Sequence, residues 1–246
     1  MRSSAKRPEY VIEHMEEEDP DAPSVFPEWA LLEYRHMLSL IGPGSTVHFT
    51  SLSPVSLDTL RQALKQQPAS SSGSTAATPA RADFELHTAS ITTLAKQRNI
   101  SLDSICLLDP RAPLCLHSSD SGKYSRPAGA SEADAAIAVD KPFTHFLFGG
   151  ILGDDPPRDR TGSLRALGFP RRHLGKVQMT TDTALGATKR VVEDGMGMGE
   201  ANEGPRGAGA NGELEWVEYP ELYFGQGESV GVAPWCLRGC HTILSR

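Results

Sequence analysis

The stretch that most directly decides the fold is the apolar run His145-Phe146-Leu147-Phe148, which passes straight into Gly149-Gly150-Ile151-Leu152-Gly153-Asp154. A short, continuous apolar run that ends in glycines predicts a buried strand of a parallel sheet. Glycine has no Cβ, so the backbone after this strand can approach a ligand closely. Ligands of open α/β sheets bind beyond the carboxyl ends of the strands, and this segment therefore predicts one side of a ligand site.

The residues that follow argue against a phosphate site. A phosphate-binding loop would need a helix to begin here, and Pro156-Pro157 disfavours one. Asp154 and Asp155 would also repel a phosphate. A loop that binds a ribose or a cation fits these residues better, and a tight acidic turn without a ligand is the plain alternative.

The rest of the chain alternates between predicted strands and helices. Helical patterns cover 27–41 and about 181–194, and the alternating residues 214–218 predict a late or edge strand. Three further apolar runs predict buried strands, at 10–12, 46–49 and 105–108. Together these elements predict an α/β fold with a mainly parallel sheet.

Composition supports one globular unit. The chain has 246 residues, 39% of them hydrophobic, which suffices for a single core. No apolar run approaches 18 residues, so we expect no membrane span, and the basic N-terminus lacks the apolar core of a signal peptide. Four cysteines are too few for a disulfide framework, which favours a cytoplasmic protein. The net charge of −7 suits a basic partner better than nucleic acid.

Low-complexity stretches divide the chain. We expect a single domain over residues 10–224, preceded by a flexible N-terminus at 1–9. Residues 225–246 form a predicted tail. Ser-, Ala-, Pro- or Gly-rich composition predicts flexible inserts at about 66–82, 117–140 and 195–212.

Two groups of carboxylates follow predicted strands. The acidic run after the first strand includes Glu13, Glu16 and Glu17. It is either a solvated loop or a clamp for a guanidinium, whose planar fork of donors matches carboxylates. Asp109 follows the strand at 105–108 and either holds a turn or belongs to the site.

A second candidate segment runs from Arg172 to Ala184, where a loop leads into a helix whose first amides are free to bind a ligand. Thr180-Thr181-Asp182 also has the composition of an ordinary helix cap. We predict no metal site, because HExxH and paired CxxC motifs are absent and Cys236, Cys240 and His241 lack a second ligand pair.

Taken together, these blocks resemble the SPOUT-class protein arginine methyltransferases of fungal type. The resemblance is carried by 148–154 with 156–161 and by 174–184, and by N-terminal and central blocks at 10–17, 27–34 and 107–112. It implies a deep trefoil knot in the C-terminal part of the sheet and S-adenosylmethionine as cofactor. The implied cofactor-binding residues are Phe148, Gly149, Gly150, Ile151, Gly153, Leu174, Gly175, Gln178, Met179, Thr180, Thr181 and Ala184.

The resemblance further implies transfer of one methyl group to an arginine of a small-subunit ribosomal protein, by a monomer or a homodimer. We expect Glu13, Glu16 and Glu17 to hold the guanidinium, supported by Asp109 or Asp154. The chain departs from the family pattern at 230–240, where a strand with a Pro-Phe-Arg-Tyr pattern is expected.

Two alternatives stay open. The first is an RNA methyltransferase of the same class, for which direct RNA binding would use a local basic cluster. That cluster comprises Arg158, Arg160, Arg165, Arg171, Arg172 and Lys176. The second is a ribosome-assembly protein that binds the cofactor without catalysis.

Overall fold

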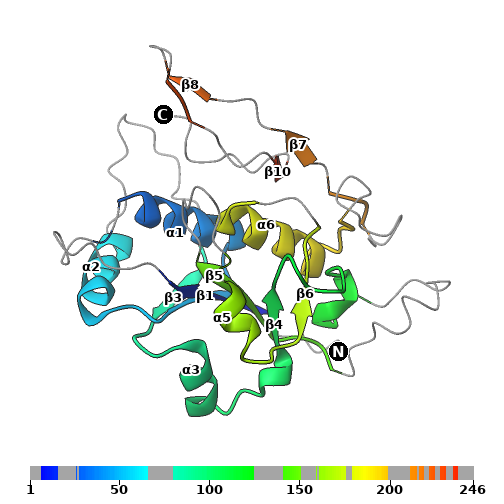
Figure 1. Ribbon diagram of the computed structural model, residues 1–246, viewed down its shortest axis with the longest axis horizontal. Helices are drawn as coiled ribbons and strands as arrows, with labels where there is room; N and C mark the ends of the chain where they lie inside the picture. The colour runs from blue at the N-terminus through cyan, green and yellow to red at the C-terminus, as the bar shows by residue number, and fades with distance from the viewer. Residues whose placement is uncertain are drawn as a thin grey trace.

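The computed structural model shows an α/β protein built around one parallel sheet (Figure 1). It describes residues 7–15, 26, 28–65, 80–124, 141–150, 159, 161–175, 179–198 and 211–214, together with the backbone of four short strands between 216 and 237.

The central sheet has six strands in the order β3-β2-β1-β5-β4-β6, and every neighbouring pair is parallel. The strands are β1 (Glu9–His14), β2 (Thr46–Thr50), β3 (Asp83–Leu86), β4 (Ile105–Leu108), β5 (His145–Gly150) and β6 (Arg171–Arg172). The four predicted strands and the mainly parallel sheet are confirmed. Within this sheet, the strands that were not predicted are the two edges, β3 and β6, because neither is a continuous apolar run.

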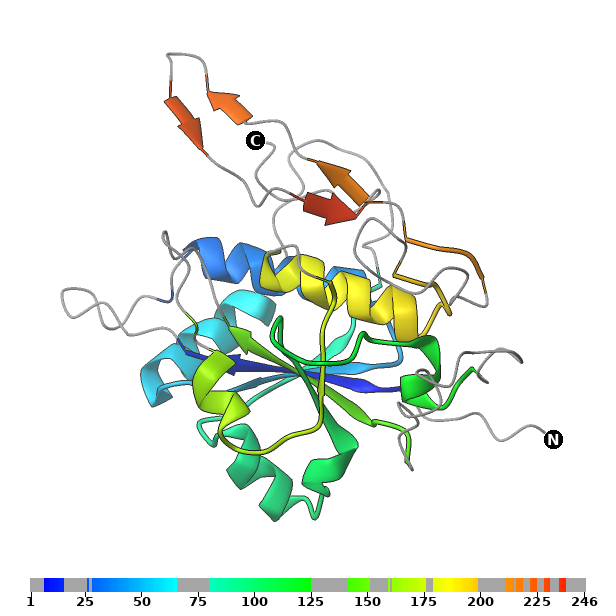
Figure 2. The same cartoon turned by 45° about the vertical axis from the view of Figure 1, so that its right-hand side comes forward.

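Helices cover both faces of this sheet (Figures 1 and 2). One face carries α1 (Glu28–Ile41), α2 (Pro54–Lys65) and α6 (Thr181–Val192), whose apolar side chains join those of the strands in the larger core. The other face carries α3 (Ile91–Gln97) and α5 (Thr161–Arg165), which pack on a smaller core. Two short 3₁₀ helices complete these layers, η1 (Leu102–Ser104) and η2 (Ser118–Ser121).

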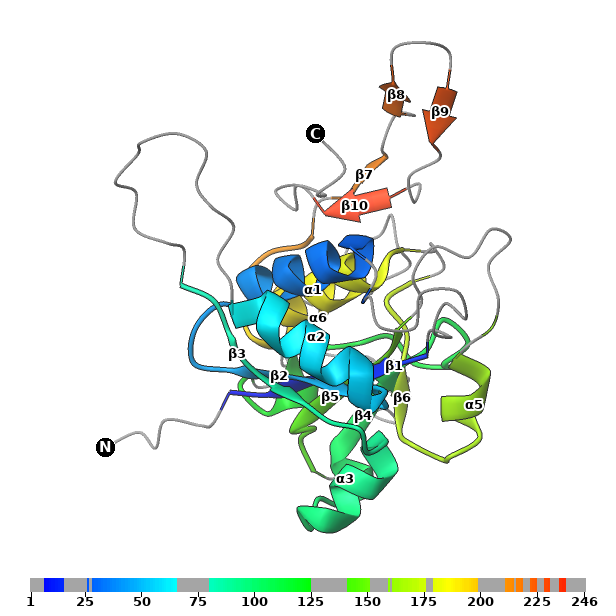
Figure 3. The ribbon, with the colours of Figure 1, turned by 90° about the vertical axis from the view of Figure 1, so that its left-hand side faces the viewer.

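The two predicted helices are confirmed, although α1 begins one residue later than predicted and α6 ends two residues earlier. Gly42 follows α1 with a φ of +70°, and Gly195 follows α6 with a φ of +74°, a region that glycine enters without a steric penalty. Thr180 is the N-cap of α6. Since α1 and α6 lie side by side on the same face, elements from opposite ends of the chain form one layer (Figure 3).

The C-terminal strands form two separate antiparallel pairs beyond α1 and α6 (Figures 1 and 3). β7 (Trp216–Glu218) pairs with β10 (Trp235–Leu237), and β8 (Leu222–Phe224) pairs with β9 (Glu228–Val230). The strand predicted at 214–218 is therefore confirmed over 216–218, where it pairs outside the central sheet.

Parts of two segments that were predicted to be flexible, at 1–9 and 117–140, are packed against the rest of the protein. In the N-terminus predicted at 1–9, Arg7 bonds to Glu193 and Pro8 is buried. The insert predicted at 117–140 begins with the packed helix η2, whose Asp120 is 1% exposed. The contact between Arg7 and Glu193 joins residues that are far apart in the sequence, so local composition could not predict it.

Two expectations are not decided by the described residues. The trefoil knot stays a prediction, because 151–158 and 176–178 lie outside them. The second expectation is that the chain has no membrane span. Among the described residues, no helix has the length and apolar composition that a bilayer span requires.

Candidate active site at the carboxyl ends of the strands

The carboxyl ends of β1, β4, β5 and β6 lie at the same edge of the sheet, because all six strands are parallel. This edge brings together the described residues of all the predicted site segments. It collects Glu13 from β1, Asp109 after β4, Phe148 to Gly150 from β5, and Leu174 and Gly175 after β6.

The glycines that end β5 let it approach β1 closely. Gly149 and Gly150 pair with Glu13 and His14, and a Cβ added to Gly150 would lie 2.9 Å from the Glu13 carbonyl oxygen. A side chain at position 150 would therefore push the two strands apart. Strand packing alone accounts for this glycine, whatever ligand lies beyond it.

Glu13 is held by hydrogen bonds from within the protein. Its carboxylate accepts from the hydroxyls of Thr50 and Ser51, each at 2.5 Å, and from the Ile91 amide at 3.0 Å. The side chain is 7% exposed. These three donors connect β1 to β2 and to the start of α3, so this carboxylate already has a set of partners that does not include a guanidinium.

His14 on the opposite face of β1 has a local partner. Its Nδ1 lies 2.8 Å from the Tyr34 hydroxyl, and its ring packs against Phe26. Burial lowers the pKa of His14 to about 4, so the imidazole is neutral at physiological pH. His14 therefore forms a local hydrogen bond within the protein.

Asp109 is the centre of an ion cluster. Its buried carboxylate accepts from Arg165 at 2.7 and 2.8 Å, from Arg171 at 2.8 Å, and from the Arg111 amide at 3.0 Å. Burial alone would raise the pKa of Asp109, but these hydrogen bonds and the arginine charges lower it to about 2. Arg165 also pairs with Asp159, so the cluster fixes the loop after β4 against α5 and β6.

Ion pairs within the protein also engage several residues of the predicted basic cluster. Arg165 and Arg171 bind Asp109, while the buried Arg172 binds Asp120 through two nitrogens at 3.0 and 3.2 Å. Three of the six basic residues therefore have carboxylate partners. The other three, Arg158, Arg160 and Lys176, lie outside the described residues.

The start of α6 carries a buried acid. Asp182 is 3% exposed, and its carboxylate accepts from the Thr180 hydroxyl and, at 2.8 Å, from the Thr183 amide. His36 on α1 lies 3.8 Å from the other oxygen of this carboxylate. A negative side chain in the first turn disfavours a phosphate at this helix end and suits a cationic ligand.

The predicted cofactor segments contribute to one apolar surface. Phe148 and Leu174 are buried members of the larger core, and the half-buried Met179 and Ala184 pack against it. Gly175, with a φ of +97°, turns the chain after Leu174 and donates its amide to the His173 ring at 3.0 Å. Apolar side chains from three separate segments thus contribute to the same core, on the face covered by α1 and α6.

Several predicted site residues lie outside the described residues. These are Glu16, Glu17, Ile151, Gly153, Asp154 and Gln178. Arg165 and Arg171 were predicted only as members of a basic cluster, and neither Asp182 nor His36 was predicted for the site. The sequence indicated only weakly that these four residues belong near the site, because it did not show which carboxylate would face which cation.

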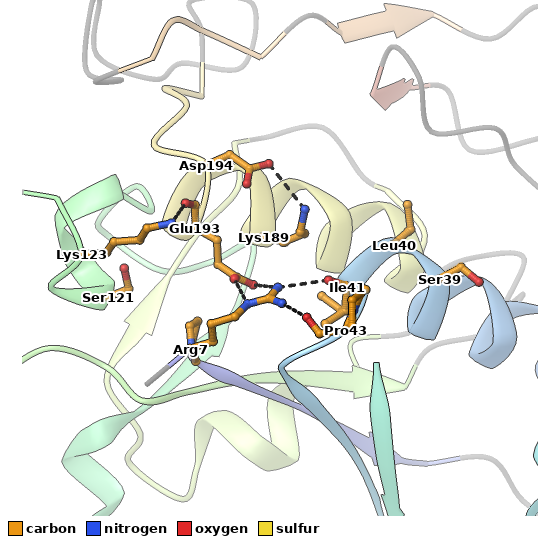
Figure 4. Close-up of a pocket in the computed structure, with 12 residues that line it drawn as sticks. Arg7, Ser39, Leu40, Ile41, Pro43, Ser121, Lys123, Lys189, Glu193 and Asp194 are labelled. Atoms are coloured by element: carbon orange, nitrogen blue, oxygen red, sulfur yellow. Dashed lines mark hydrogen bonds and ion pairs between the residues drawn. The ribbon is translucent and has the colours of Figure 1, made fainter. Parts of the chain in front are cut away.

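A pocket of about 820 Å³ lies at the other end of the sheet (Figure 4). Arg7 crosses it and binds the Glu193 carboxylate and the Ile41 carbonyl, while Lys123 binds the Glu193 carbonyl. Its walls come from the ends of α1 and α6 and from the residues before β1. This pocket is therefore distinct from the predicted site, which lies at the carboxyl ends of the strands.

Comparison with known proteins places this arrangement in a family. The family described as "Protein arginine N-methyltransferase SFM1-like" matches residues 9–233. Protein arginine N-methyltransferase SFM1 of Saccharomyces cerevisiae (strain ATCC 204508 / S288c) is 30% identical in an alignment of 230 residues that covers 89% of this chain and 81% of the yeast protein.

Solved structures agree. The crystal structure of the yeast arginine methyltransferase SFM1 complexed with SAM matches with a TM-score of 0.62 and 26% identity, over 96% of this chain and 84% of the yeast chain. The complex with SAH gives the same TM-score and identity over 93% and 86%. The family predicted from the sequence motifs is confirmed, and the chain belongs to the SFM1-like protein arginine N-methyltransferases.

Proposed function

We propose that this protein transfers the methyl group of S-adenosylmethionine to an arginine side chain of a small-subunit ribosomal protein, giving monomethylarginine. The observation that carries the proposal is the family match over residues 9–233, which includes every segment gathered at the carboxyl ends of the strands. We also propose that it acts in the cytoplasm, as a monomer or a homodimer.

The described residues fit this cofactor. Leu174, Met179 and Ala184 offer apolar surface to an adenine ring, and Asp182 makes the start of α6 unfavourable for a phosphate. S-adenosylmethionine has no phosphate and carries a positive sulfonium, so both features suit it. When bound, it supplies a methyl group that is already activated for transfer.

The protein must then align a nitrogen nucleophile and receive a proton. A free guanidinium is protonated and offers no lone pair, so a bond from nitrogen to the methyl carbon requires loss of an N–H proton. The carbon–sulfur bond breaks as the carbon–nitrogen bond forms. Carboxylates can hold the guanidinium in one orientation and accept the proton during or after transfer.

Two of the carboxylates that were candidates for the guanidinium clamp already have partners within the protein. Glu13 is engaged by Thr50, Ser51 and Ile91, and Asp109 by two arginines. We assign both to positioning, because each holds a loop at the carboxyl edge of the sheet. The clamp itself is proposed for Glu16 and Glu17, supported by Asp154.

The charge of the protein supports the proposed substrate class. A net charge of −7 favours a basic protein partner. The RNA alternative would need a positive surface, and the carboxylates paired with Arg165, Arg171 and Arg172 reduce what those residues can offer to phosphates.

The test is transfer of labelled methyl from S-adenosylmethionine, with small-subunit ribosomal proteins and ribosomal RNA offered in parallel. We expect label on an arginine of one ribosomal protein, and acid hydrolysis should release monomethylarginine. Label on RNA would contradict the proposal and favour the RNA alternative. Cofactor binding by calorimetry with no label on either acceptor would favour the non-catalytic ribosome-assembly protein.

A further inference from the structure

A cluster of histidines and glutamates lies away from the cofactor segments. Glu9 and His145 face each other on β1 and β5, and His48 and Glu85 face each other on β2 and β3. His87 follows two residues after Glu85, so it lies on the same face of the sheet. This is the face covered by α3, whereas the apolar cofactor surface belongs to the core under α1 and α6.

Three atoms of this cluster are spaced like the ligands of one metal ion. His48 Nδ1 lies 3.3 Å from His87 Nε2, His87 Nε2 lies 3.4 Å from Glu85 Oε2, and Glu85 Oε2 lies 3.8 Å from His48 Nδ1. Metal–ligand bonds of about 2.0–2.2 Å in a tetrahedron separate neighbouring ligand atoms by roughly 3.3–3.5 Å. The triangle thus needs only a small adjustment of Glu85 to surround an ion.

The orientation of His48 supports this arrangement. The side chain is 2% exposed, and its Nε2 donates to the Glu9 carboxylate at 2.6 Å. A neutral imidazole that donates through Nε2 has its lone pair on Nδ1, the atom that faces His87 and Glu85. A carboxylate behind a ligating histidine fixes the tautomer and the direction of the ring in protein metal sites. The buried His48–Glu9 pair therefore directs a ligand lone pair into the triangle.

His87 can serve as a neutral ligand. A ring nitrogen of a neutral imidazole is a common metal ligand, and Nε2 of His87 lies 3.3 Å from Nδ1 of His48 and 3.4 Å from Oε2 of Glu85. Glu85 lies at the surface end of the triangle, where its side chain is 43% exposed. Water can therefore complete the coordination from the solvent side.

We propose that His48, Glu85 and His87 form a binding site for one divalent transition-metal ion of the zinc type. Two imidazoles and one carboxylate match zinc, cobalt or nickel and do not match magnesium, which prefers oxygen ligands. The ion would connect β2 to the edge strand β3. Arg98 at the end of α3 contacts Glu85 and competes with the ion for its carboxylate.

The experiment titrates the full-length protein with Zn²⁺ by calorimetry and with Co²⁺ by visible absorption, with Mg²⁺ as the control ion. We expect one bound Zn²⁺, a tetrahedral cobalt spectrum and no Mg²⁺ binding. His87→Ala and Glu85→Gln should each weaken Zn²⁺ binding at least about 100-fold, because changes behind a ligand already cost roughly 10- to 100-fold. Arg98→Ala should strengthen binding severalfold, since it removes a competing cation.

Control variants show whether Zn²⁺ binds at this triangle or elsewhere on the chain. Asp58→Asn removes a surface carboxylate that is 72% exposed and should leave Zn²⁺ binding unchanged. Cys236→Ser with Cys240→Ser should also leave it unchanged. Thermal unfolding without metal checks that each variant is folded. Absence of Zn²⁺ binding in the wild type, or binding that survives both His87→Ala and Glu85→Gln, would overturn the proposal.

Discussion

The two ends of the central sheet each bury a carboxylate among cations, yet they serve different purposes. At the amino end, Glu193 accepts from Arg7 at 2.5 Å and from the Tyr10 hydroxyl at 2.6 Å. At the carboxyl end, Asp109 accepts from Arg165 and Arg171. The first cluster joins the start of β1 to the ends of α1 and α6, and the second holds loops beside the predicted cofactor segments.

This comparison shows that a buried, paired carboxylate is not by itself a mark of catalysis. Both clusters satisfy a charge that would be costly to bury alone. What distinguishes them is position, because ligands of a parallel sheet lie beyond the carboxyl ends of its strands. Changes at the carboxyl end should therefore affect turnover, whereas changes at the amino end should affect only stability.

The largest effect is expected when the proposed clamp is removed. The double variant Glu16→Gln and Glu17→Gln should lower kcat by about 100- to 1000-fold, because a positioned carboxylate contributes on that order to proton transfer. Methyl transfer to the proposed ribosomal protein substrate measures kcat, and calorimetry measures the Kd of S-adenosylmethionine, which should stay the same. Unchanged kcat would refute the clamp, and a weakened Kd would place these residues in the cofactor site.

A smaller effect is expected at the amino end. Glu193→Ala leaves the buried Tyr10 hydroxyl and the Arg7 guanidinium without their carboxylate, and should lower the free energy of unfolding by about 3 kcal/mol. Urea unfolding measures this loss. Asp194→Asn is the matched control, since Asp194 is 34% exposed and should change stability by less than about 0.5 kcal/mol. A fall in kcat per folded Glu193→Ala molecule would remove the distinction between the two ends.

The third and smallest expected effect is a dependence of the free energy of unfolding on pH, caused by Asp109 at the carboxyl ends of the strands. Asp109 has a folded pKa of about 2 against an ordinary value of 3.8, so the native state releases this proton more readily than the unfolded state. Its contribution to stability is complete above about pH 5, and about 2 kcal/mol is lost as the pH falls through 4 to 2.

Asp109→Asn tests that contribution. The variant should be less stable at neutral pH, and its stability should change less between pH 5 and 2 than that of the wild type, as measured by urea unfolding at each pH. Asp58→Asn, which alters an exposed ion pair with Arg61, should retain the wild-type acid dependence. Identical pH profiles for the wild type and Asp109→Asn would contradict the lowered pKa.

The edge of the sheet that carries the predicted site could be identified from the sequence, because glycines and acids directly after apolar runs mark the ends of buried strands. Asp109, Gly149 and Gly150 were found in this way, and all three lie at the carboxyl edge. The partners of those acids could not be predicted. Arg165 lies 56 residues after Asp109, and nothing in the local pattern connects them.

The sequence by itself determined the class of fold, the four inner strands of the sheet, and the helices at 28–41 and 181–192, but not α2, which is as long as α6. Burial on both faces of the sheet requires apolar runs, and a helix end requires its cap or glycine. It also determined the family, through motifs that extend over the chain. The tertiary structure alone decided the edge strands and the pairing of charges, with Glu13 bound to hydroxyls, Asp109 to arginines, and His48 directed at His87. Those choices depend on side chains brought together from distant segments, and short-range patterns carry no information about which of them will meet.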